Sequence, residues 1–201
     1  MQKHRFLLQV LKQKWVGGWR AGFEPMVGKH DATVWSIEVH WTAKVVLVSL
    51  RIFRFRSKKD LPVFHPEGTE EEFLRRFPYV FDATIRPPPG STIPQFRLTA
   101  YRELVPLEIL GHTFIPIPVP HGSATVFGFR VGPLGYITDG KSLPPDAIGA
   151  LKGVRVLVLN ALWFGNPHPT HFNIEEAIAA SEEVGAQTTY LNHLTHEVGH
   201  Q

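Results

Sequence analysis

The sequence predicts an α/β fold in which layered sheets carry helices on their outer faces. Short apolar runs typical of strands follow one another from residue 61 onward, and segments with helical periodicity lie between them. The run Val154 to Leu159 (VRVLVL) is mostly apolar, as expected for a strand covered on both faces. Many strands with helices packed outside them favour layered sheets over a simple doubly wound sheet. The length of 201 residues fits one domain with a sizeable core, so we predict a single domain over residues 1–201.

The front segment, residues 1–59, differs in composition from the remainder of the chain. Its net charge is +9 against −6 for the remainder, and it contains four of the five tryptophans. Within it, Lys44 to Phe55 is rich in β-forming residues, and Arg51 and Arg54 alternate with aromatic and aliphatic side chains. Such a mixture can follow a nucleic-acid backbone, but it is also typical of a strand with one exposed face. Nucleic-acid binding is therefore the weaker interpretation.

The first regular elements are expected directly after this segment. Leu61 to Phe64 predicts a strand, and Thr69 with Glu72 predicts a capping box that opens a helix ended by Pro78. A Pro-rich loop at residues 87–90 is typical of an active-site rim. Further strands are expected at residues 95–100 and 113–119, and a hairpin at 125–138 around Gly132–Pro133. Prolines at 116 and 118 indicate that the second of these strands lies at an edge or ends there.

The C-terminal third has the clearest helix of the chain. A short helix is expected near Pro145, before the apolar strand at residues 154–159. Asn173 and Glu176 predict a capping box, and Gly185 predicts the left-handed end of the helix that follows. The last strand is expected at residues 188–191.

The overall composition excludes several classes of site. The chain has no cysteine, which rules out disulfides, thiolate metal sites and cysteine nucleophiles. No apolar run is long enough to span a bilayer, and lysines interrupt the apolar stretch near the start, so no export signal is expected. A cytoplasmic protein is the default expectation.

Candidate ligands occur where the predicted strands end. His121 and Asp139 each follow a strand, His193 follows the last one, and His171 lies just before the predicted helix. Residues 167–200 hold five of the eleven histidines. Imidazole nitrogens and carboxylate oxygens suit Zn²⁺, Mn²⁺ or iron at a hydrolytic centre. An Asp before Gly is also a common turn former, and loop histidines often have no function. The repeated placement at strand ends nevertheless favours a site.

Three stretches carry a family resemblance. The run PIPVPHGSATVFGFRVGPLGYITDG, followed by PHPTHFNIEEAI and YLNHLTHEVGH, resembles the metallo-β-lactamase fold. The resemblance is greatest to its phosphodiesterase branch, which includes a cyclic-phosphate phosphodiesterase and, more distantly, ribonuclease Z. It covers residues 61–201 and implies a metallo-β-lactamase-like αββα sandwich, irregular or incomplete at the N-terminus, with a metal pair at the sheet edges.

The resemblance also implies roles for single residues. His121, Asp139 and His193 match metal ligands for Zn²⁺ or Mn²⁺, and Asp139 would bridge two ions. His171 matches a histidine that stabilises charge or protonates the leaving oxygen, and His168 would assist it. His196 and His200 have weaker claims and are interpreted as bystanders.

The implied activity is hydrolysis of a phosphodiester by metal-activated water. The substrate would be a small phosphodiester or a nucleotide-like molecule, and a homodimer is left open.

The chain departs from the family pattern at its first metal motif, HxHxDH. The corresponding stretch reads His40-Trp41-Thr42-Ala43-Lys44-Val45, in which only His40 could serve as a ligand. A further departure is Asn160, where the family often has Asp. Two explanations are open: the front segment is altered, for instance by a shifted reading frame, or the chain is a catalytically inactive homologue that acts as a binding or structural module.

Overall fold

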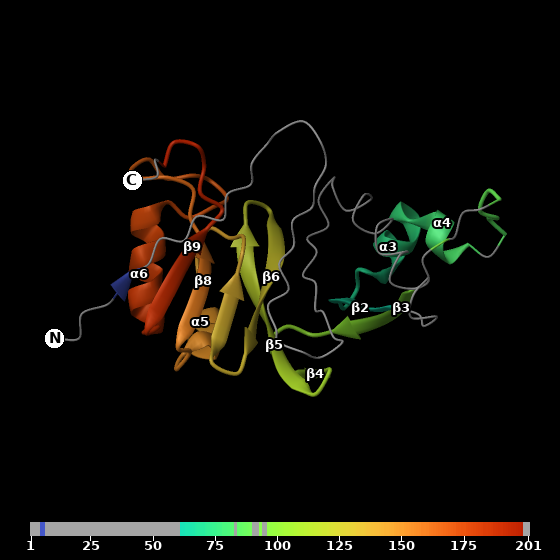
Figure 1. The fold of residues 1–201 in the computed structure, drawn as a ribbon, viewed down its shortest axis with the longest axis horizontal. Coiled ribbons are helices and arrows are strands. Elements are labelled where there is room, and N and C mark those ends of the chain that lie inside the picture. Colours follow the sequence, from blue (N-terminus) through green and yellow to red (C-terminus); the bar gives the residue numbers. More distant parts are fainter. Residues whose placement is uncertain (1–4, 7–60, 83, 90–92, 94–95, 199–201) are drawn as a thin grey trace. The chain divides into compact units, whose positions relative to one another are not determined.

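The computed structural model describes residues 5–6, 61–82, 84–89, 93 and 96–198 (Figure 1). Most of the front segment, including His40 to Val45, lies outside the described residues, as does His200. The chain divides into two compact units, one of Met1–Asp31 with Glu103–Gln201 and the other of Ala32–Arg102. Within the described residues, no helix combines the length and apolar character that crossing a bilayer requires.

The unit that contains residues 103–201 is built on a mixed sheet. Among the described residues its strand order is β1-β9-β8-β7-β6-β5-β4. Strands β7, β8 and β9 run parallel, whereas β4 to β7 form an antiparallel meander. The elements of this unit are β1 (Arg5–Phe6), β4 (Leu107–Ile109), β5 (His112–His121), β6 (Ala124–Val131), β7 (Leu134–Ile137), α5 (Pro145–Leu151), β8 (Val156–Asn160), α6 (Ile174–Val184) and β9 (Thr188–Asn192).

Strand β5 agrees with the expectation that its prolines mark an edge. Among the described residues, His112 to Phe114 pair with β4, while the part of β5 that carries Pro116 and Pro118 pairs with β6 and with no other described strand. A proline cannot donate to a neighbouring strand, so it is tolerated at such a place. The carbonyl oxygen of Pro116 accepts from Leu104 N at 2.8 Å. The hairpin around Gly132–Pro133 also forms as expected, with Val131 opposite Leu134.

Helix α6 confirms the predicted capping signals. The Asn173 side chain accepts a hydrogen bond from Glu176 N at 2.8 Å, and the Glu176 side chain accepts one from Asn173 N at 3.0 Å. At the other end Gly185 adopts the left-handed conformation with φ 76°. These caps satisfy backbone groups that a helix terminus leaves without partners, which fixes where the segment containing His171 meets the helix.

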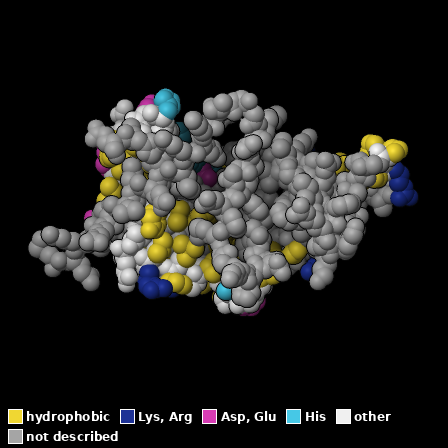
Figure 2. Space-filling view, viewed as in Figure 1, with side chains coloured by type: hydrophobic (Ala, Val, Ile, Leu, Met, Phe, Trp, Pro, Cys, Tyr) yellow, Lys and Arg dark blue, Asp and Glu magenta, His cyan; other side chains and the backbone are white. Residues whose placement is uncertain are grey.

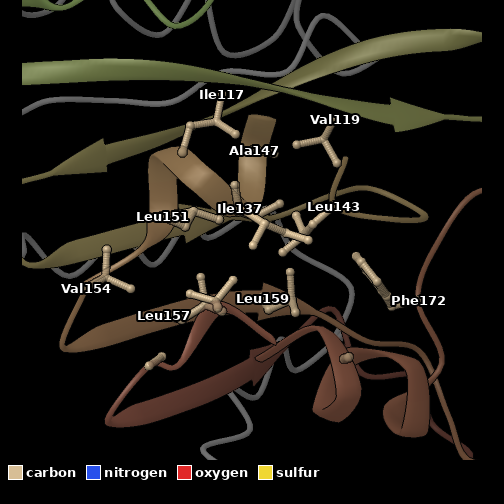
Figure 3. Close-up of a cluster of buried hydrophobic side chains, with 14 of the residues drawn as sticks. Ile117, Val119, Ile137, Leu143, Ala147, Leu151, Val154, Leu157, Leu159 and Phe172 are labelled. Atoms are coloured by element: carbon tan, nitrogen blue, oxygen red, sulfur yellow. The ribbon is translucent and has the colours of Figure 1, made fainter. Parts of the chain in front are cut away.

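The main core lies between the sheet and the helices that pack on it (Figure 3). Ile117 of β5 and Leu157 of β8 point toward Leu151 of α5, and all three side chains are fully buried. Burying a side chain of this size contributes about 1.5–3 kcal/mol each. Ala177 and Val184 bring helix α6 into the same cluster.

The two faces of the sheet are buried to different extents. In β8, Leu157 and Leu159 are fully buried whereas Val156 and Val158 are half-buried. No residue of β8 is exposed, and the face with Leu157 and Leu159 is covered more completely than the face with Val156 and Val158. Figure 2 shows hydrophobic side chains between the grey segments on the face turned to the viewer. A half-buried apolar face is the kind of surface against which the second sheet of an αββα sandwich packs.

The unit of residues 32–102 contains a second, smaller sheet in its described part. Its elements are β2 (Leu61–Pro66), α3 (Glu70–Arg76), α4 (Pro78–Phe81) and β3 (Phe96–Tyr101). Strands β2 and β3 pair in parallel, and Phe77 is buried between them and α4 with Val63 and Leu98. Pro78 ends α3 as expected, but it also begins the short helix α4, because proline is tolerated in the first turn of a helix.

Candidate metal centre

His121 is the last residue of β5, and its ring is oriented by the segment that precedes α6. Its Nδ1 lies 3.0 Å from the carbonyl oxygen of Thr170, to which it donates. With the proton on Nδ1, a neutral ring keeps its lone pair on Nε2, the arrangement found in metal-bound histidines. Gly122 permits this approach, because its φ is +63° and a Cβ there would lie 2.9 Å from Thr170 Cγ2.

Asp139 lies in a tight loop after β7. The loop is held by the carbonyl oxygen of Gly140, which accepts from Phe172 N and from Asn160 Nδ2, both at 3.0 Å. Gly140 has φ +148°, and a Cβ there would lie 2.3 Å from Val119 Cγ1, so the position accepts only glycine without a shift of its surroundings. The Asp139 side chain is 12% exposed, so its carboxylate is largely shielded from solvent.

His193 directly follows β9, and its side chain approaches Asp139, which lies in the loop after β7. Its backbone has φ 64°, an uncommon conformation for a residue other than glycine, and its Nε2 lies 3.2 Å from Asp139 Oδ1. The carboxyl ends of parallel strands meet at one edge of a sheet, which is where open α/β sheets bind ligands. Left-handed backbone at a residue with a side chain costs about 1–3 kcal/mol and is concentrated at functional sites.

His171 joins the same carboxylate from the segment before α6. Its Nε2 donates to Asp139 Oδ1 at 2.9 Å, and its Nδ1 lies 2.8 Å from the hydroxyl oxygen of Thr170. With the proton on Nε2, Nδ1 of the neutral ring accepts from that hydroxyl. Thr170 N also donates to His168 Nδ1 at 3.3 Å. Thr170 thus contacts three histidines through its carbonyl, its amide and its side chain.

The histidine rings pack edge to face around Asp139. The ring centroids of His171 lie 4.6 Å from His121 and 4.9 Å from His193. Burial lowers the pKa of His171, and the neighbouring His193 and His121 act in the same direction, while Asp139 opposes them. The net direction is downward, so the neutral form of the imidazole predominates at pH 7, and the ring acts as an acid only after it takes up a second proton.

The structure brings most of the residues singled out from the sequence together. His121, Asp139, His171 and His193 meet at one sheet edge, and His168 contacts His171 with ring centroids 5.1 Å apart. His196 is exposed.

Two residues near the site were not predicted from the sequence, Thr170 and Trp163. The ring centroid of Trp163 lies 5.5 Å from that of His168. Thr170 stands inside the PHPTHF stretch, so its position between two candidate histidines was an available signal.

The donor set fits a divalent transition metal. One ligand atom each of His121, Asp139 and His171 lies within 4.8 Å of the others, and the Nε2 atom of His193 reaches the same carboxylate. Imidazole nitrogen with carboxylate oxygen is a preferred ligand combination for Zn²⁺, and it also suits Mn²⁺.

The chain belongs to the β-lactamase superfamily, since residues 46–194 match the sequence model of the β-lactamase superfamily domain. A solved structure described as a new diphosphatase from the PhnP family is similar, with a TM-score of 0.64 and 28% identity. That likeness covers 79% of this chain and 56% of the diphosphatase. The metallo-β-lactamase fold protein YhfI from Bacillus subtilis has a TM-score of 0.62 at 18% identity, covering 81% of this chain and 64% of that one. The expected metallo-β-lactamase fold is confirmed.

A curated relative has a different name. The octanoyltransferase of Porphyromonas gingivalis (strain ATCC BAA-308 / W83) is 29% identical over 138 residues, which make up 69% of this chain and 27% of that protein. The chain therefore spans about a quarter of this relative. Most of the octanoyltransferase lies outside the match, so its name does not assign an activity to the shared part.

Proposed function

We propose that this chain is a metal-dependent hydrolase of a small phosphodiester or nucleotide-like substrate. The observation that carries the proposal is the approach of two imidazoles, of His171 and His193, to the single carboxylate oxygen Asp139 Oδ1. The superfamily fold and the similarity to a PhnP-family diphosphatase support phosphoester chemistry. A small substrate, a cytoplasmic location and a homodimer remain predictions.

In this proposal His121, Asp139 and His193 hold the metal, either Zn²⁺ or Mn²⁺. A bound ion of this kind polarises a phosphoryl oxygen and lowers the pKa of a coordinated water. His121 and Asp139 are fixed for this role by backbone contacts on neighbouring loops, at Thr170 and Gly140. His193 brings its ring to the site at the cost of left-handed backbone.

His171 is assigned the proton transfer to the leaving oxygen, with His168 beside it. Its Nε2 carries the proton in the arrangement described above, and Asp139 orients it. For this transfer the ring carries a proton on both nitrogens: Nδ1–H donates to the Thr170 hydroxyl oxygen, and loss of the Nε2 proton to the leaving oxygen leaves a neutral imidazole. A positioned general acid of this kind contributes about 10²–10⁴-fold to a rate.

Metal analysis together with turnover of bis(p-nitrophenyl) phosphate tests the proposal. The purified chain should bind Zn²⁺ or Mn²⁺ and hydrolyse the diester, and His121→Ala should abolish both properties. His112→Ala is a matched control, because His112 is an exposed histidine at the other end of the same strand. A chain that binds no metal under any loading condition overturns the proposal.

The alternative function is that of a catalytically inactive binding or structural module. It is favoured by the stretch His40 to Val45, which lacks three of the four ligand residues of the family motif. Metal binding without turnover of any phosphodiester, in a protein whose His121→Ala variant loses the metal, would favour this alternative.

A further inference from the structure

Two asparagines end neighbouring strands at the sheet edge that carries the candidate metal centre. Asn160 is the last residue of β8 and Asn192 the last of β9, and the two are opposite each other in the parallel register. Asn160 is fully buried, and its Nδ2 donates to the carbonyl oxygen of Gly140 at 3.0 Å. Gly140 directly follows the candidate ligand Asp139 in the chain, and Asn192 directly precedes the candidate ligand His193.

The side-chain oxygens of both asparagines are buried, and neither has a hydrogen-bond partner in the described part of the chain. A buried polar atom without a partner costs about 1–3 kcal/mol, so two such atoms at one place require an explanation. Residues opposite each other on adjacent parallel strands project from the same face of the sheet, which places the two amides side by side. A half-turn of the Asn192 amide exchanges its oxygen and nitrogen, and turns an NH₂ group into the interior.

We propose that Asn192 donates a hydrogen bond to Asn160 Oδ1, so that Asn192, Asn160 and Gly140 form one amide chain. The rotated group removes both unsatisfied oxygens at once, because the Asn192 oxygen then faces outward. Asn160 receives one bond and donates one, which makes it the central positioning residue of the chain.

The amide chain links the loops that carry the candidate ligands. It runs from the residue before His193, across the end of β8, to the residue after Asp139. The hydrogen-bonded chain extends beyond Gly140, because the Gly140 carbonyl oxygen also accepts from Phe172 N, and Phe172 directly follows His171. We infer that Asn160 and Asn192 position these side chains, and do not touch substrate or metal themselves. This inference rests on the proposed function in treating Asp139 and His193 as metal ligands.

Hydrogen exchange of the side-chain amides tests the bond without metal or activity. In ¹⁵N-labelled protein, the Asn192 NH₂ protons should exchange at least about tenfold more slowly than those of the exposed Asn166. They should also show proximity to the Asn160 side chain in nuclear Overhauser spectra. Exchange of the Asn192 amide as fast as that of Asn166 overturns the proposal.

The affinity for Zn²⁺ alone tests the positioning role. Asn160→Ala and Asn192→Ala should each weaken binding by about 10–100-fold, as is typical for groups that orient metal ligands. The double variant should be no weaker than the poorer single one, because either substitution breaks the same chain. Losses that multiply in the double variant, or no loss in either single one, contradict the proposal.

A control on the same strand separates positioning from general stability. Thr189 of β9 is buried and forms a side-chain hydrogen bond with Ser181 of α6, away from the strand end. Thr189→Val should lower the midpoint of urea unfolding and leave the Zn²⁺ affinity unchanged within about twofold. If it weakens Zn²⁺ as much as Asn160→Ala does, the asparagines act only through stability. If the unsubstituted protein binds no Zn²⁺, the proposed function fails, and the exchange experiment still decides the hydrogen bond.

Discussion

His171 and Asp139 are separated by 32 positions in the chain, and Nε2 of the one lies 2.9 Å from Oδ1 of the other. The same oxygen is 3.2 Å from Nε2 of His193. A single carboxylate oxygen therefore organises two imidazoles that arrive from different segments. This relationship is the basis of the proposed hydrolytic centre. Among the proposed ligands, we expect the loss of Asp139 to reduce metal binding most.

Removing the charge of Asp139 should abolish metal binding. Asp139→Asn keeps the size of the side chain but replaces the anionic oxygen that both imidazoles approach. We expect Zn²⁺ affinity, measured by competition with a chelator, to fall by more than about 100-fold. Loss of a group that only orients a metal ligand already lowers metal affinity by about 10–100-fold. Asp146→Asn, at an exposed position in α5, is the matched control. Retention of wild-type affinity in Asp139→Asn contradicts the proposed ligand set.

Replacing His171 should separate proton transfer from metal binding. His171→Gln removes the group that protonates the leaving oxygen, so the loss should be larger for an alkyl leaving group than for p-nitrophenolate, which leaves without a proton. We expect kcat for the alkyl diester to fall by about 10²–10⁴-fold with the metal content unchanged. If the protein instead loses its metal, His171 is a ligand and the general acid lies elsewhere.

The Thr170 hydroxyl should matter through hydrogen bonding rather than through packing. Its oxygen lies 2.8 Å from His171 Nδ1, so the hydroxyl donates to Nδ1 when that nitrogen is unprotonated and accepts from it when it carries the proton. Thr170→Val keeps the shape and removes the hydrogen bond, so kcat should fall by about tenfold, the equivalent of one net hydrogen bond of roughly 1.5 kcal/mol. Thr170→Ser should restore most of the rate. Equal activity in the Val and Ser variants would argue against this role.

Gly140 should be irreplaceable for stability. Gly140→Ala places a Cβ 2.3 Å from Val119 Cγ1 and holds alanine at φ +148°. Overpacking and backbone strain together should lower the free energy of unfolding by about 2–4 kcal/mol. Gly149 in helix α5 is the matched control, because a Cβ there meets nothing within 4 Å. Urea unfolding should show Gly149→Ala at or above wild-type stability.

The capping carboxylate of Glu176 should make stability depend on acidic pH. Burial alone would raise the pKa of Glu176, but hydrogen bonds from Lys141 and Asn173 N outweigh burial and lower it. A lowered folded-state pKa means that this stability is present above the unfolded value of 4.5 and lost as the pH falls below it.

Glu176→Gln should therefore be less stable than wild type at pH 7, with the difference shrinking toward pH 3. Urea unfolding across this range measures the difference, with Glu182→Gln, an exposed position on the same helix, as the control. A difference that does not change with pH would show that the carboxylate charge contributes nothing.

Local signals in the sequence were sufficient for the elements around α6. The Asn173–Glu176 capping box, the Gly185 end and the apolar face of the helix depend on neighbours within a few residues, and all of them form as expected. The same holds for the hairpin at Gly132–Pro133. The candidate ligands could also be chosen from the sequence, because strand ends and residue chemistry are both readable there.

Contacts between distant segments could not be read from the sequence. Nothing local indicates that Thr170 binds His121, 49 positions away, or that Asn160 holds the carbonyl of Gly140. Such contacts depend on the order and register of β7, β8 and β9, which pair segments far apart in the sequence. The half-buried second face of β8 could not be predicted either, because an apolar sequence does not show how completely each face of the strand is covered. Residue types and strand ends thus fixed the candidates, and long-range packing set which of them meet.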